Sequence, residues 1–81
     1  SANEIISRIG ADLAEIRRTE LERALSRASN GDDVEAVLED FSKALLSKIM
    51  NGPYCVMREA SRSGKASIYE AAADLFGVDD I

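Results

Sequence analysis

The chain contains one cysteine, Cys55, which precedes Arg58 by three residues. A nucleophilic cysteine needs a base, or positive surroundings that convert the thiol to thiolate. Arg58 lies one helical turn away and favours the thiolate, but it cannot accept the proton, and the sequence has no histidine. Cysteine is also among the residue types most often buried as a small apolar side chain. The pattern therefore predicts that Cys55 is packed in the structure and is not catalytic.

A cluster of carboxylates follows the first third of the chain and raises the possibility of a divalent metal site. Glu35 and Glu39 lie four residues apart, so both fall on one face of a helix. The cluster lacks the ligand spacing of a calcium loop and has no histidine to assist it. Acidic residues at a helix start stabilise the positive end of the helix dipole. We expect a solvated capping cluster, with these members: Asp32, Asp33, Glu35, Glu39 and Asp40.

Two further patterns concern phosphate groups and nucleic acids. Gly64-Lys65 lacks the complete phosphate-loop motif and a preceding strand, so it predicts a surface turn. A basic run, interleaved with Glu15, Glu20 and Glu22, has the spacing of a helix face held by ion pairs. A contact with another domain or with an RNA backbone remains the alternative for this run, which consists of Arg17, Arg18, Arg23 and Arg27.

Size and charge limit the class of protein. A chain of 81 residues forms one small domain and hides only about 60% of the surface that its unfolded chain exposes. It has no disulfide pair and no evident metal site, so a second copy of the chain is the expected source of further stability. The net charge of −5 argues against a free-standing nucleic-acid binder.

The single cysteine fits a reducing compartment, and no apolar run approaches the ~20 residues that cross a bilayer. We therefore expect no membrane partner and a location in the cytoplasm. No signal peptide is evident. The sequence begins at Ser1 and not at Met, which we interpret as a piece of a longer protein.

Apolar spacing predicts helices almost throughout and no strand. The first helix, residues 3–28, would be about 40 Å long, whereas a compact chain of this size is roughly 24 Å across. Its apolar stripe changes face partway, which predicts two different neighbours. The first part of the stripe contains Ile6, Ile9, Leu13 and Ile16, and the second part contains Leu21, Leu25 and Ala28.

Turn and capping residues place the other helices. Asn30-Gly31 ends the first helix, Asp32 or Asp33 caps the next, and Glu35 completes a capping box. This second helix, residues 33–50, ends at Asn51-Gly52, because Pro53 suits a helix start and not a helix interior. A third helix is expected over residues 53–61. A fourth is expected over residues 67–76, capped by Ser67 and ended by Gly77.

Two stretches resemble the glutamyl-tRNA reductase family. Residues 15–25, "EIRRTELERAL", resemble part of the long spinal helix of that family. Residues 45–79, "LLSKIMNGPYCVMREAS…IYEAAADLFGVD", resemble the end of the family, with Asn51-Gly52 where a histidine usually precedes the proline. The matching positions of the second stretch are Leu45, Lys48, Pro53, Met57, Arg58, Glu59, Ala60, Tyr69, Leu75, Phe76, Gly77 and Asp79.

The resemblance implies an all-α, dimeric, small helical bundle. Residues 1–29 would be the end of the spinal helix and residues 30–81 the homodimerisation domain. The family reduces glutamyl-tRNA with NADPH to glutamate-1-semialdehyde, on the way to porphyrins and haem. Its catalytic cysteine and NADPH site belong to other domains. The resemblance thus implies that this fragment is non-catalytic, holds no cofactor of its own, and meets glutamyl-tRNA only through the parent enzyme.

The residues expected to divide between the core and the dimer interface come from two of the predicted helices, the second and the fourth. The sequence does not assign each one to core or interface. A hetero-interaction module and, less favoured by the charge, an RNA-contacting module remain alternatives. The predicted set is Val34, Val37, Leu38, Phe41, Leu45, Ile49, Ile68, Leu75 and Phe76.

Overall fold

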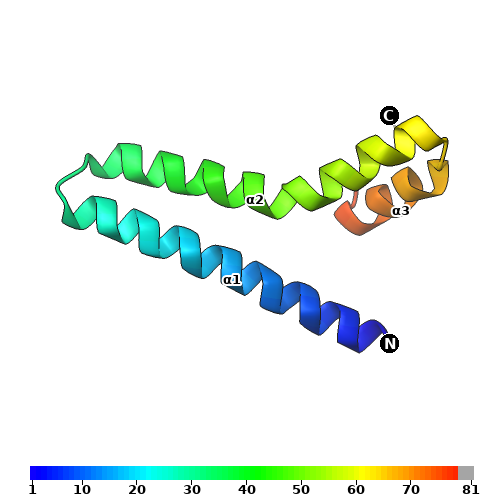
Figure 1. Ribbon diagram of the computed structural model, residues 1–81, viewed down its shortest axis with the longest axis horizontal. Helices are drawn as coiled ribbons and strands as arrows, with labels where there is room; N and C mark the ends of the chain where they lie inside the picture. Colours follow the sequence, from blue (N-terminus) through cyan, green and yellow to red (C-terminus); the bar gives the residue numbers. More distant parts are fainter. Residues whose placement is uncertain (79–81) are drawn as a thin grey trace. The chain divides into compact units, whose positions relative to one another are not determined.

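Three helices form the part of the chain described by the computed structural model, residues 1–78 (Figure 1). They are α1 (Ala2–Ser29), α2 (Val34–Ser63) and α3 (Ala66–Phe76), and no strand occurs among these residues. The chain divides into two compact units, Ser1–Met50 and the part from Asn51 onward, and α2 runs from the first into the second. The all-α prediction is confirmed. The functional division into residues 1–29 and 30–81 stays a prediction.

The first helix, α1, has 28 residues and is therefore about 42 Å long. The Ser1 side chain accepts a hydrogen bond from the Glu4 backbone N–H and caps the helix start. The other end lies at Ser29, after which Gly31 adopts a φ of 89°. Glycine takes this left-handed conformation without the steric cost that a Cβ would bring. The predicted long first helix and its end at Asn30-Gly31 are confirmed.

Asp33 caps the start of α2. Its carboxylate accepts a hydrogen bond of 3.0 Å from the backbone N–H of Ala36, three residues later. The predicted capping box with Glu35 is wrong, because Ala36 occupies the position from which a side chain would reach back to Asp33. Glu35 lies in the first turn of α2, where its negative charge favours the helix dipole.

The predicted break at Asn51-Gly52-Pro53 is wrong, since α2 continues to Ser63 with Pro53 inside it. Proline has no backbone N–H, so only the carbonyl of Ile49 loses its helical donor. Proline also disfavours a helical conformation in the residue before it, through that residue's backbone N–H and its Cβ. Here the preceding residue is Gly52, which has no Cβ, so the helix continues at the cost of one hydrogen bond.

α3 begins one residue earlier than predicted and has Lys65 at its cap position, with no side-chain hydrogen bond. The predicted cap, Ser67, lies inside the helix. The turn before α3 is closed by the Lys65 N–H, which donates to the Ala60 carbonyl at 2.9 Å. Gly77 ends α3 in the left-handed conformation, as predicted. Asp79, which contributed to the family resemblance, lies outside the described residues.

Each unit buries little. In the first unit, α1 and the start of α2 run antiparallel (Figure 1), and Val37 is 4% exposed between them. In the second unit, Ala60 is buried where α3 packs against the last turns of α2. The prediction that Cys55 is packed is wrong, because α3 covers Ala60 but leaves Cys55 exposed.

Candidate dimer interface

The contact between α1 and α2 is centred on a buried carboxylate, Glu20, which is 3% exposed. Lys48 of α2 donates to its Oε2 at 2.6 Å, and Arg23 of α1 donates to its Oε1 at 2.9 Å. The hydrogen bond from Lys48, above all, holds the pKa of Glu20 below its ordinary value, against the opposite effect of burial. Two cations thus keep this carboxylate charged inside the helix pair.

A second ionic contact closes the end of the pair nearest the turn. Arg27 of α1 donates to Asp40 of α2 at 2.7 Å and to Asp32 in the turn at 2.8 Å. Hydrogen bonds to these carboxylates, Asp32 first, raise the pKa of Arg27. Two members of the predicted acidic cluster therefore neutralise one arginine, and this arrangement fixes the turn between the helices.

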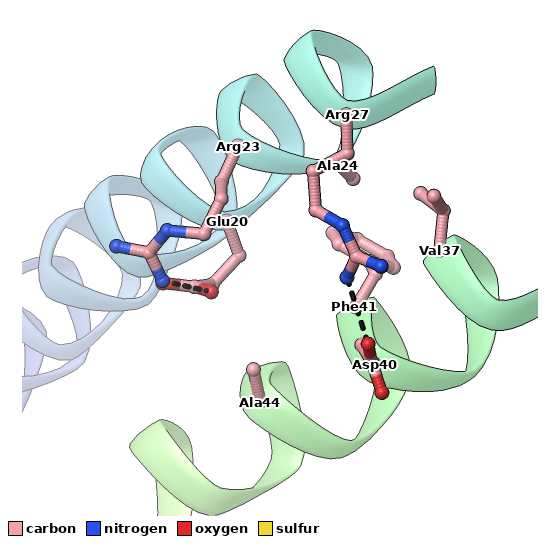
Figure 2. Close-up of a pocket in the computed structure, with 8 residues that line it drawn as sticks. All are labelled: Glu20, Arg23, Ala24, Arg27, Val37, Asp40, Phe41 and Ala44. Atoms are coloured by element: carbon pink, nitrogen blue, oxygen red, sulfur yellow. Dashed lines mark hydrogen bonds and ion pairs between the residues drawn. The ribbon is translucent and has the colours of Figure 1, made fainter. Parts of the chain in front are cut away.

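Figure 2 shows a small cavity between these contacts, with the Arg23–Glu20 and Arg27–Asp40 pairs at its edges. Its volume is about 90 Å³, which leaves room for water but not for a substrate of ordinary size. Within residues 1–78, no group of three or more potential metal ligands comes together. The cavity is therefore a feature of helix packing. It is lined by Glu20, Arg23, Ala24, Arg27, Val37, Asp40, Phe41 and Ala44.

The basic run is held by ion pairs, as its spacing predicted. Arg18 donates to Glu15 and, at 2.9 Å, to Glu22, and both carboxylates raise the pKa of Arg18. Arg23 and Arg27 bind the carboxylates described above. Three of the four arginines thus already have anionic partners within the chain, which counts against a free phosphate-binding face.

An apolar stripe on α2 lies beside the contact with α1. We call Val34, Leu38, Leu45 and Ile49 the α2 stripe. Leu38, Leu45 and Ile49 each follow a residue that faces α1, and one residue turns the helix by about 100°. The stripe therefore faces one side of the helix pair: Val34 is 62% and Leu38 60% exposed, whereas Leu45 and Ile49 are half-buried.

α1 contributes apolar residues to the same side of the pair. Leu21 and Leu25 each follow a residue, Glu20 or Ala24, that faces α2. In antiparallel helices a step of one residue turns both helices toward the same side, so these leucines lie on the side of the α2 stripe. Leu25 is exposed and Leu21 is half-buried. The predicted interface set omitted both, although the change of face at Leu21 in the α1 stripe indicated them.

The remaining predicted residues occupy different surroundings. Val37 and Phe41 line the contact with α1. In the second unit Ile68 is half-buried, Phe76 is exposed and Leu75 is 82% exposed. Assignment of these residues to a dimer interface stays a prediction. Large apolar residues outside the predicted set are exposed as well: Ile5, Ile6, Ile9, Leu46, Tyr54, Val56 and Val78.

Cys55 lies at the edge of a shallow hollow in the second unit, beside Ala60 and Ile68. Arg58 donates to its sulfur at 3.7 Å. Arginine stabilises a thiolate but cannot act as a general base. The prediction that Cys55 lacks catalytic machinery rests on this chemistry, whereas the predicted burial does not hold.

None of the described helices has the length and apolar character that crossing a membrane requires.

Comparison with known proteins identifies relatives along nearly the whole chain. Residues 1–78 match the family described as glutamyl-tRNA(Glu) reductase, dimerisation domain. The chain is 41% identical over 63 residues to glutamyl-tRNA reductase of Cenarchaeum symbiosum, which covers 75% of the chain and 15% of that protein. It is 29% identical over 77 residues to glutamyl-tRNA reductase of Methanothermobacter thermautotrophicus, covering 95% of the chain and 19% of that protein.

A third relative is the glutamyl-tRNA reductase of an Acidovorax species, 31% identical over 72 residues, or 89% of the chain and 16% of that protein. The chain thus spans less than a fifth of the length of these relatives. No solved structure matches it. With a family match that extends over all three helices, the chain belongs to the glutamyl-tRNA reductase dimerisation domain family.

Proposed function

We propose that this chain holds two copies of a glutamyl-tRNA reductase together as a homodimer. The observation that carries the proposal is the exposure of Val34 and Leu38, in the α2 stripe of a chain of this family. Apolar side chains gain roughly 25 cal/mol for each Å² of surface removed from water, so a surface of this kind favours a partner.

The chain takes no part in the chemistry under this proposal. The reductase acts on glutamyl-tRNA with NADPH and forms glutamate-1-semialdehyde, in the cytoplasm, and other domains supply the catalytic cysteine and the NADPH site. The absence of a general base near Cys55 supports this division of labour, since the sequence contains no histidine. Arg18, Arg23 and Arg27 are already paired with carboxylates of the chain. This supports the proposal that tRNA contacts other parts of the enzyme and not these arginines.

Sedimentation equilibrium of the 81-residue chain tests the proposal, with Leu38→Asp as the variant. The proposed dimer buries Leu38 of each copy. Loss of both leucines costs at least about 3 kcal/mol for each dimer, so the dissociation constant should rise more than about 100-fold. Ser47→Asp is the matched control, because it adds the same charge to α2 away from the stripe. Circular dichroism checks that both variants keep their helices.

A dimer that is unaffected by Leu38→Asp would show that α2 does not carry the contact. A wild-type chain that stays monomeric at all concentrations would overturn the proposal and favour a hetero-interaction module.

A further inference from the structure

The segment Asn51-Gly52-Pro53 lies inside α2 and has no part in the proposed function. We propose that Asn51 is a site of spontaneous deamidation in the folded chain, because Pro53 removes the protection that a helix normally gives to an Asn-Gly pair. The only reactants are the chain itself and water. The inference does not depend on the proposed function, since it does not assume that the chain dimerises.

Deamidation begins when the backbone nitrogen of Gly52 attacks Cγ of the Asn51 side chain. The Gly52 N–H gives its proton to hydroxide, a bond forms between this nitrogen and Cγ, and the bond from Cγ to Nδ2 breaks. Nδ2 takes a proton from water and leaves as ammonia, so a cyclic succinimide remains. Addition of water then opens the ring to aspartate or isoaspartate. Glycine favours the attack because it has no side chain to obstruct it.

A regular helix prevents this reaction. Each helical N–H donates to the carbonyl four residues earlier, so the nitrogen is not free to attack. The Asn51 side chain is also turned along the helix, where the thiol of Cys55 donates to its Oδ1 at 4.0 Å. Deamidation of Asn51 therefore requires α2 to open locally at Gly52.

Three features favour such an opening at this point of α2. Pro53 has no N–H, so the helical hydrogen bond next to that of Gly52 is missing. Glycine, moreover, is one of the least favoured residues in a helix interior. Residues 51–53 are exposed, and the second unit begins at Asn51. Opening there breaks few backbone bonds and uncovers no buried side chain of these three residues, so it should be frequent.

A second Asn-Gly pair, Asn30-Gly31, provides an internal control. It lies in the turn after α1, is exposed, and is followed by Asp32 and not by proline. The Gly31 N–H donates to the carbonyl of Ala28 at 3.1 Å. Because Pro53 is not involved in these contacts, a change at Pro53 should leave the deamidation rate of Asn30 unaltered.

Peptide mapping by mass spectrometry tests the proposal after incubation of the 81-residue chain in mildly alkaline buffer. Each deamidated asparagine carries an oxygen in place of its amide nitrogen, so the rates at Asn51 and Asn30 are measured separately. The variant is Pro53→Ala, whose alanine N–H restores the missing hydrogen bond. We expect Asn51 to deamidate in the wild type and at least about tenfold more slowly in the variant. The rate at Asn30 should be the same in both.

Guanidinium chloride separates the effect of the helix from that of the neighbouring residues. Asn51 should react equally fast in the two unfolded chains, and circular dichroism checks that both chains are helical without denaturant. A folded wild-type chain in which Asn51 stays unmodified, while the unfolded chain reacts, would overturn the proposal. Equal rates at Asn51 in the two folded chains would overturn it as well. So would a difference that persists in guanidinium chloride, because it would belong to the local sequence and not to the helix.

Discussion

Lys48 on α2 and Glu20 on α1 are 28 residues apart in the sequence, yet their side chains meet at 2.6 Å inside the helix pair. This contact fixes how far α1 slides along α2, because only one register brings the lysine to the buried carboxylate. Removal of one partner from a buried ion pair leaves the other charge without compensation.

Glu20→Gln should therefore lower the stability of the chain to urea. Glutamine keeps the shape of the side chain but leaves Lys48 and Arg23 without a counter-charge. Glu22→Gln is the control, since Glu22 pairs with Arg18 at the surface, where ion pairs contribute little. Equal urea midpoints for the two variants would contradict a special role for Glu20. Circular dichroism gives both midpoints.

The pH dependence of stability should reflect the same carboxylate. The pKa of Glu20 in the folded chain lies below its ordinary value of 4.5, chiefly because of Lys48. The stability that it contributes is thus fully present above pH 4.5 and is lost as the pH falls through the lowered pKa. Thermal unfolding of the wild type and of Glu20→Gln should differ above the ordinary pKa of 4.5 and converge as the pH falls through the lowered pKa. A difference that persists at low pH would contradict this assignment.

Val37→Ala should destabilise the helix pair by about 2 kcal/mol, because it removes two buried methyl groups and leaves a gap between α1 and α2. Val34→Ala is the matched control on the exposed side of α2. It should leave the unfolding midpoint of dilute protein nearly unchanged and weaken the dimer instead. Urea unfolding at several protein concentrations separates the two effects, since only dimerisation makes the midpoint depend on concentration.

Pro53→Ala should stabilise α2. The alanine N–H restores a hydrogen bond to the Ile49 carbonyl, and alanine is favoured over proline inside a helix by up to about 3 kcal/mol. The urea midpoint should rise by a corresponding amount. A lower midpoint would show that the proline ring makes contacts that outweigh the missing hydrogen bond.

Local sequence rules predicted much of the fold. The C-terminal end of α1, the start of α2 and the end of α3 depend on Asn30, Asp33 and Gly77, whose effects are confined to a few residues. The prediction failed at Pro53. Asn51-Gly52-Pro53 is typical of a turn, but Gly52 also lacks the Cβ that usually prevents a helix from continuing into proline. The sequence alone does not decide between these two outcomes.

The site depends on contacts that the sequence does not show. Glu20 is buried because Lys48 neutralises its charge. In the sequence, Glu20 lies among arginines and other glutamates of the same helix, and nothing there indicates a partner 28 residues away. The separation of Val37 and Phe41 from Val34 and Leu38 likewise depends on the rotation of α2 about its axis, which only the packing of α1 determines. Cys55 is exposed because α3 packs over Ala60 and does not cover Cys55.

The missing hydrogen bond at the Ile49 carbonyl has a consequence for how the chain opens. It lies at the boundary between the two units, next to Met50. The turns of α2 beyond Asn51 can therefore fray or unfold while Glu20 and Lys48 stay in contact. Amide hydrogens after Pro53 should exchange with deuterium faster than those of residues 38–49, so that one continuous helix behaves as two segments of unequal lifetime.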